Sequence, residues 1–131
     1  MATQVRTLDN RLPQRILEID GLFELIVGAG LLLASETVAR WIGISGNLIA
    51  ITGILTMGVG GWLMYVAQRQ ATRQMLQLIA SFNLVWVVGS GLVLALEWNG
   101  LANEGRWLIA LVADVTLILA VAELYARRHT A

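Results

Sequence analysis

The sequence predicts an all-α integral membrane protein, an antiparallel four-helix bundle that occupies residues 1–131 as a single domain. Hydrophobic residues make up 57% of the chain, charged residues only 14%, and the mean hydropathy is +0.71. This composition is too apolar for a soluble domain of this length. Two stretches, 41–68 and 74–96, contain no charged residue. Each exceeds the roughly 20 helical residues that cross about 30 Å of hydrocarbon.

The first membrane-spanning helix is expected at about residues 16–34, although this stretch carries Glu18, Asp20 and Glu24. It is too apolar to be left as a loop among membrane-spanning neighbours. An irregular backbone exposed to lipid would leave its N–H and C=O groups without partners. We therefore expect a helix whose polar side chains turn toward the other helices.

The segments on either side of this helix are expected at the membrane surface. Residues 1–15 are predicted to form an interfacial N-terminal segment. Pro13 suits the first turn of the first helix or the approach to it, because the missing N–H has no partner there in any case. The link over residues 35–46 places hydrophobic residues between Glu36 and Arg40, a pattern that favours a short helix lying in the interface.

The other three membrane-spanning helices are expected at about residues 47–67, 75–96 and 106–126. They are joined by short connections over residues 68–74 and 97–105. Short connections place consecutive helices antiparallel to each other. One compact bundle of alternating direction follows.

The basic residues indicate the orientation. All nine are arginines, and seven of them fall at one end of the predicted bundle. By the positive-inside rule, that end is cytoplasmic, so both termini and the link between the second and third helices are expected inside. The seven arginines are Arg6, Arg11, Arg15, Arg69, Arg73, Arg127 and Arg128, against Arg40 and Arg106 at the other end.

Small residues are expected to bring the helices into contact, because lipid offers apolar side chains no incentive to associate. The candidates are Gly28 in the first helix, Gly53 and Gly60 in the second and Gly89 in the third. The alternative interpretation is a glycine-lined groove for a lipid, a quinone or a partner helix.

Five side chains form a candidate intramembrane polar site: Asp20, Glu24, Asn83, Trp86 and Asp114. Glu24 and Asn83 lie about equally far from the cytoplasmic helix ends and are predicted to meet. Asp20 is one turn from Glu24, Trp86 shares a face with Asn83, and Asp114 lies deeper. Three roles stay open for the acids: interhelical hydrogen bonds that fix register, a proton path or ligand contact, and a lipid-headgroup or subunit contact.

Several chemistries lack the residues that they need. The chain has no cysteine, and its single histidine is His129, near the C-terminus. No nucleophile motif or phosphate-binding loop is present. We therefore predict no catalytic residue, no metal and no cofactor. The expected partners are the lipid bilayer and either another membrane protein or further copies of the chain, with no nucleic acid.

Three segments carry a resemblance to a known type of protein. They are GLFELIVGAGLLLA at residues 21–34, NLVWVVGSGLVLAL at residues 83–96 and ELYARR at residues 123–128. Over about residues 16–128 the chain resembles a group of small bacterial four-helix membrane proteins of uncharacterised function. The resemblance implies the fold and an inner-membrane location. The chain departs from that group in carrying Glu24 and Asp114 within its membrane-spanning helices.

These observations favour a non-enzymatic integral membrane protein that serves as an accessory or scaffolding component of a membrane complex. The alternative is a small transporter, or a proton-linked protein that binds a ligand or lipid, which would use the intramembrane acids. The two differ in geometry. A transporter needs the acids in a common cavity, whereas a scaffold seals them in helix contacts.

Overall fold

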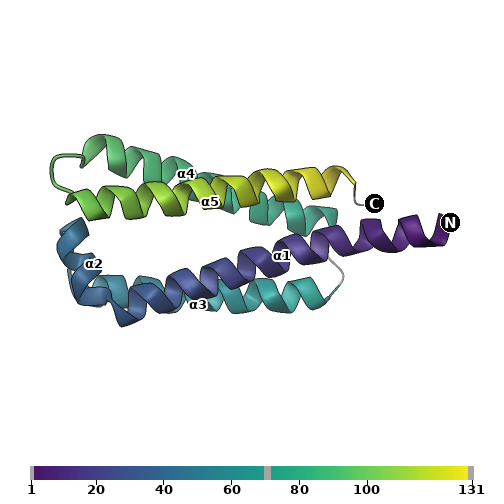
Figure 1. Cartoon of the computed structure of the whole chain (residues 1–131), viewed down its shortest axis with the longest axis horizontal. Coiled ribbons are helices and arrows are strands. Elements are labelled where there is room, and N and C mark those ends of the chain that lie inside the picture. The colour runs from purple at the N-terminus through teal and green to yellow at the C-terminus, as the bar shows by residue number, and fades with distance from the viewer. Residues whose placement is uncertain (1, 70–71, 130–131) are drawn as a thin grey trace.

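The computed structural model describes residues 2–69 and 72–129, and for residues 2–10 it describes the backbone alone. This part of the chain is all-helical. Four long helices lie side by side, and a short helix, α2, crosses the end of the bundle opposite both termini (Figure 1). Three of them, α3, α4 and α5, are long and apolar enough to cross a membrane. The five helices are α1 (Ala2–Leu33), α2 (Ser35–Ile42), α3 (Gly46–Gln68), α4 (Arg73–Leu96) and α5 (Asn103–Arg128).

The first helix is longer than the sequence predicted. Instead of beginning near residue 16, α1 starts at Ala2 and runs through Pro13. Residues 2–12 contain no glycine or second proline that would end a helix, so the backbone continues through the predicted interfacial segment. The N-terminal end of α1 extends past the other helices (Figure 1). The side chains of residues 1–10, on which the interfacial prediction rests, lie outside the described residues.

The end of α2 and the starts of α3 and α4 fall on recognisable capping residues. α2 stops at Gly43, whose φ of +85° is open to glycine at little steric cost, and whose N–H donates to the Ala39 carbonyl. Ser45 then caps α3 by accepting a hydrogen bond from the Leu48 N–H at 3.3 Å. Thr72 caps α4 in the same way. The predicted short helix in the link therefore exists as α2.

Two pairs of glycines bring α1 and α3 into backbone contact. A Cβ added to Gly28 would lie 2.6 Å from the Gly53 carbonyl oxygen, and one added to Gly60 would lie 2.8 Å from the Gly21 carbonyl oxygen. In each helix the two glycines are one heptad apart, so both fall on the same face. No side chain larger than hydrogen fits at these positions without moving a helix.

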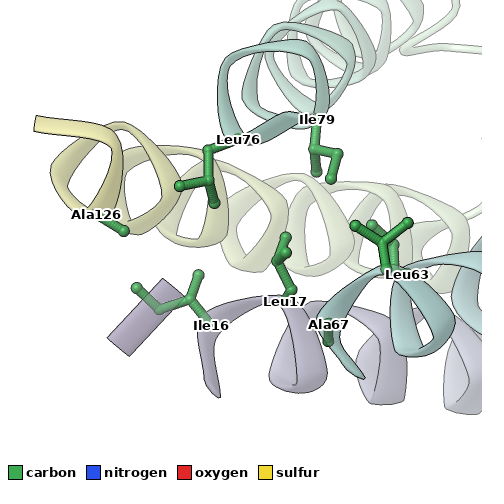
Figure 2. Packing of buried hydrophobic residues seen from close by; sticks show 8 residues of the cluster. Ile16, Leu17, Leu63, Ala67, Leu76, Ile79 and Ala126 are labelled. Atoms are coloured by element: carbon green, nitrogen blue, oxygen red, sulfur yellow. The ribbon is translucent and has the colours of Figure 1, made fainter. Parts of the chain in front are cut away.

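The four long helices pack as two pairs, α1 with α3 and α4 with α5. A hydrophobic cluster joins the pairs near the termini. Figure 2 shows Leu76 and Ile79 of α4 pointing toward Leu17 of α1 and Leu63 of α3. Leu17 and Leu76 have no exposed surface. The best-sealed part of the core therefore lies at the end of the bundle that holds both termini.

At the other end, α2 connects the two pairs. Val38 and Ala39 are buried against Ile49 of α3, with Leu108 of α5 packed beside them. The Ala102 N–H donates to the Trp41 carbonyl at 2.9 Å, which ties the turn before α5 to the end of α2. The pairs are thus held together at both ends.

Candidate functional site

Three of the four buried polar residues in the described part of the chain come together in one cluster, formed by Asp20 of α1, Asn83 of α4 and Glu123 of α5. Their exposed fractions are 0%, 5% and 0%. The Asn83 side-chain N–H₂ group donates to Asp20 Oδ2 at 3.0 Å and to both Glu123 carboxyl oxygens at 3.2 Å. One amide therefore links three helices, and these helices come from both pairs.

The two carboxyl groups of the cluster lie near each other, because both accept hydrogen bonds from the same nitrogen, Asn83 Nδ2. Two buried carboxyl groups that share a site repel each other when both are ionised, which favours a proton on one of them. The second oxygen, Asp20 Oδ1, is buried and has no hydrogen-bond partner among the described residues. Chemically, the cluster can hold a proton between two carboxyl groups while Asn83 fixes their positions.

Glu24 lies beside this cluster without joining its hydrogen bonds. It is one turn from Asp20 on the same helix and is partly exposed. The predicted meeting of Glu24 with Asn83 is wrong, because the Asn83 amide bonds to Asp20 instead. Counting residues from the expected helix ends places Asn83 level with Glu24. In the structure Asn83 bonds to Asp20, one helical turn away on α1.

Two predicted site residues face away from the cluster. Trp86 is 48% exposed, although it lies three residues from Asn83. Such a spacing turns a side chain by about 60° around a helix, which here places the indole on the outer surface. Asp114 is also exposed. Its neighbours Ala113 and Thr116 take the inward face of α5 instead.

The sequence-based site omitted Glu123, although a signal for it exists. Glu123 lies three residues from Ala120 and seven from Thr116, and all three are buried on one face of α5. Small residues mark the face of a membrane helix that packs against other helices. An acid on that face is therefore a better candidate for an interior position than Asp114, which lies off it.

Three of the four glycines predicted to mediate helix packing lie in a helix contact, and one does not. Gly28, Gly53 and Gly60 lie in the contact between α1 and α3. Gly89 is exposed, and a Cβ added there would meet nothing within 4 Å among the described residues. α4 packs against α5 through another face, so the expectation that Gly89 mediates a helix contact is wrong.

The described residues contain no group of acidic, histidine or cysteine side chains that could hold a metal ion. No protein-family model, curated protein or solved structure matches the chain. The fold and the site therefore define an all-helical protein with three helices suited to a membrane and one sealed cluster of carboxyl and amide groups.

Proposed function

We propose that the chain is a non-enzymatic integral membrane protein, an antiparallel four-helix bundle that acts as an accessory or scaffolding component of a membrane complex. In this proposal the cluster of Asp20, Asn83 and Glu123 fixes the two helix pairs in register. The observation that supports it most is that these groups are sealed from solvent and bonded to one another. The three side chains are therefore not lined up along a solvent-filled channel through the bundle.

The proposal makes α1 the fourth membrane-spanning helix. α1 holds three acids in the part that packs in the bundle, which makes it less apolar than α3, α4 and α5. The paired glycines nevertheless keep α1 in backbone contact with α3 from Gly21 to Gly28. If α3 crosses the bilayer, this part of α1 crosses with it. Burying Asp20 against Asn83 removes part of the cost of placing an acid at that depth.

For the location, we propose a bacterial inner membrane with both termini in the cytoplasm. The arginines support this orientation. Arg69 and Arg73 flank the connection between α3 and α4, while Arg127 and Arg128 end α5. Figure 1 places the end of α3 and the start of α4 at the same end of the bundle as the start of α1 and the end of α5. Positive charge gathered at one end favours the cytoplasmic side.

A proton-linked carrier is the second candidate, and a specific observation favours it. Two buried carboxyl groups bond to one Asn83 amide and can hold a proton, and the partly exposed Glu24 is one helical turn from Asp20. Asp20 Oδ1 is an acceptor without a partner among the described residues. These are features of a site that exchanges protons.

Proton flux into liposomes distinguishes the two candidates. The purified chain is reconstituted with a trapped pH-sensitive dye, and a pH gradient is imposed across the membrane. For a scaffold, we expect the wild type and Glu123→Gln to give the same rate of pH change as Glu97→Gln, a control on the exposed turn after α4. A flux that Glu123→Gln alone abolishes, with the fold intact, would establish the carrier instead.

The accessory role is tested by the size of the native complex. The chain is extracted in a mild detergent from the membrane in which it naturally occurs, at its natural abundance, and the mass of the particle is measured. We expect a particle that contains a different membrane protein in a fixed ratio. A particle made only of this chain and lipid would contradict the accessory role.

A further inference from the structure

One face of α5 points outward as a continuous seam, which we call the α5 seam. Its residues recur at alternating spacings of four and three, the pattern that places side chains along one line of a helix. All of them are exposed. The seam consists of Trp107, Leu111, Asp114, Ile118, Val121 and Tyr125.

Asp114 is the exceptional residue of this seam. It is 11 residues from the start of α5 and 14 from its end, which places it about 16 Å and about 21 Å along the axis from the two ends. A side chain as short as aspartate cannot reach either interface from there. No hydrogen bond or ion pair joins it to another described residue. If α5 crosses the bilayer, lipid cannot satisfy this carboxyl group.

A comparable seam on α4 shows what an ordinary lipid-facing surface of this chain looks like. It has the same alternating spacings and the same exposure, but it contains no polar residue. Lipid can cover the α4 seam without leaving a polar side chain unpaired. The residues of this α4 seam are Leu78, Phe82, Val85, Gly89, Leu92 and Leu96. Spacing alone therefore does not mark a contact surface, whereas the carboxyl group in the middle of the α5 seam does.

We propose that the α5 seam binds the α5 seam of a second copy of the chain, in a two-fold dimer whose axis is normal to the membrane. In such a dimer each residue on the axis meets its own counterpart at the same depth. Two Asp114 carboxyl groups that share one proton provide both a donor and an acceptor, so the group is complementary to itself. The chain has no lysine, and its arginines stand near the helix ends, so no cation of a second copy reaches this depth.

The hydrophobic residues on either side of Asp114 fit this arrangement. Leu111 and Ile118 flank the carboxyl group and exclude water from it, as hydrophobic seam residues do around a buried polar residue in a coiled coil. A single polar residue in such a seam fixes register, which here keeps the two copies level. The proposal rests on the proposed membrane location of α5, and it does not depend on the accessory role or on the buried cluster.

Disulfide crosslinking of single-cysteine variants tests the dimer, and the natural chain supplies a cysteine-free background. Leu111→Cys and Ile118→Cys report on the α5 seam, and Leu92→Cys on the α4 seam is the matched control. The full chain is placed in lipid vesicles at high dilution and oxidised. We expect covalent dimers from the two α5 variants and none from the control.

Changes at Asp114 then show whether the carboxyl group is responsible. Asp114→Asn keeps a donor and an acceptor, so crosslinking should persist, whereas Asp114→Leu should weaken dimerisation by roughly 5- to 30-fold. At a dilution in detergent where the chain is monomeric, the thermal unfolding of both variants should stay near that of the wild type, because Asp114 is exposed in the single chain.

Three results would overturn the dimer. Crosslinking from Leu92→Cys that equals crosslinking from the α5 seam would mean random collision, and crosslinking unchanged by Asp114→Leu would remove the carboxyl group from the interface. Crosslinks in native membranes to a different protein, and none between copies, would assign the seam to that protein. Labelling of Ile118→Cys by a water-soluble maleimide would instead overturn the membrane location of α5, which distinguishes this failure from the others.

Discussion

Replacing Gly28 by alanine is a direct perturbation of the contact between α1 and α3. The new Cβ would lie 2.6 Å from the Gly53 carbonyl oxygen and 2.7 Å from the Met57 backbone nitrogen. Ordinary van der Waals contact begins at 3.4 Å, so the two backbones must separate by about 0.8 Å at this point. Both neighbours are main-chain atoms, which cannot rotate away as the end of a side chain can.

The size of the effect follows from two opposing contributions. Replacing glycine by alanine inside a helix is worth about 0.5–1 kcal/mol in favour of the folded state where space is available. Overpacking of a close contact costs about 1–3 kcal/mol. We therefore expect Gly28→Ala to lower the free energy of unfolding by about 1–2 kcal/mol. The control Gly30→Ala should raise it slightly, because a Cβ at Gly30 meets nothing within 4 Å.

Reversible unfolding in mixed micelles measures both variants, with tryptophan fluorescence and helical circular dichroism as probes. The pair Gly60→Ala and Gly61→Ala repeats the comparison on α3, since only Gly60 has a main-chain neighbour in the way. Equal unfolding free energies for Gly28→Ala and Gly30→Ala would refute the reasoning, because they would mean that the helices are not held at backbone contact.

Three further outcomes are expected. Arg106→Ala should lower the unfolding free energy by about 0.5–1 kcal/mol in the same assay, since the guanidinium donates to the Trp98 carbonyl at 2.6 and 2.9 Å and stands 4.4 Å above its ring. Ser45→Ala should lower the unfolding free energy by about 0.5–2 kcal/mol through loss of the α3 cap, and Ser45→Gly should lower it less. Reversible unfolding of the two variants side by side measures this difference. In intact bacterial cells, a membrane-impermeant maleimide should label Asn99→Cys and leave Gln74→Cys unlabelled; the opposite pattern would reverse the proposed orientation.

The sequence predicted the helices well where charge-free runs define them. Residues 74–96 contain no charged side chain, and α4 covers Arg73–Leu96. The prediction of a helix start near residue 16 is wrong, because α1 begins at Ala2 and runs through Pro13. A proline permits a helix start but does not require one.

The composition of the polar cluster was harder to predict, because it depends on register and on which face turns inward. Asn83 was placed opposite Glu24, one turn from its real partner Asp20. Depth counted along separate helices ignores their tilts and the shape of the connections. On α5 both faces are largely hydrophobic, so the hydrophobic pattern could not show that Glu123 turns inward and Asp114 outward. Only the small residues on the same face as Glu123, Thr116 and Ala120, indicate which face of α5 turns inward.

A double-mutant cycle between Asp20 of α1 and Asn83 of α4 tests most directly whether the buried cluster holds the two helix pairs together. Asp20→Leu, Asn83→Leu and the double variant are compared with the wild type by reversible unfolding in mixed micelles. Each single change leaves polar atoms of the cluster without a partner, so the double change should cost less than the sum of the two by about 1 kcal/mol or more. Costs that add to within about 0.5 kcal/mol would show that the two side chains do not act together.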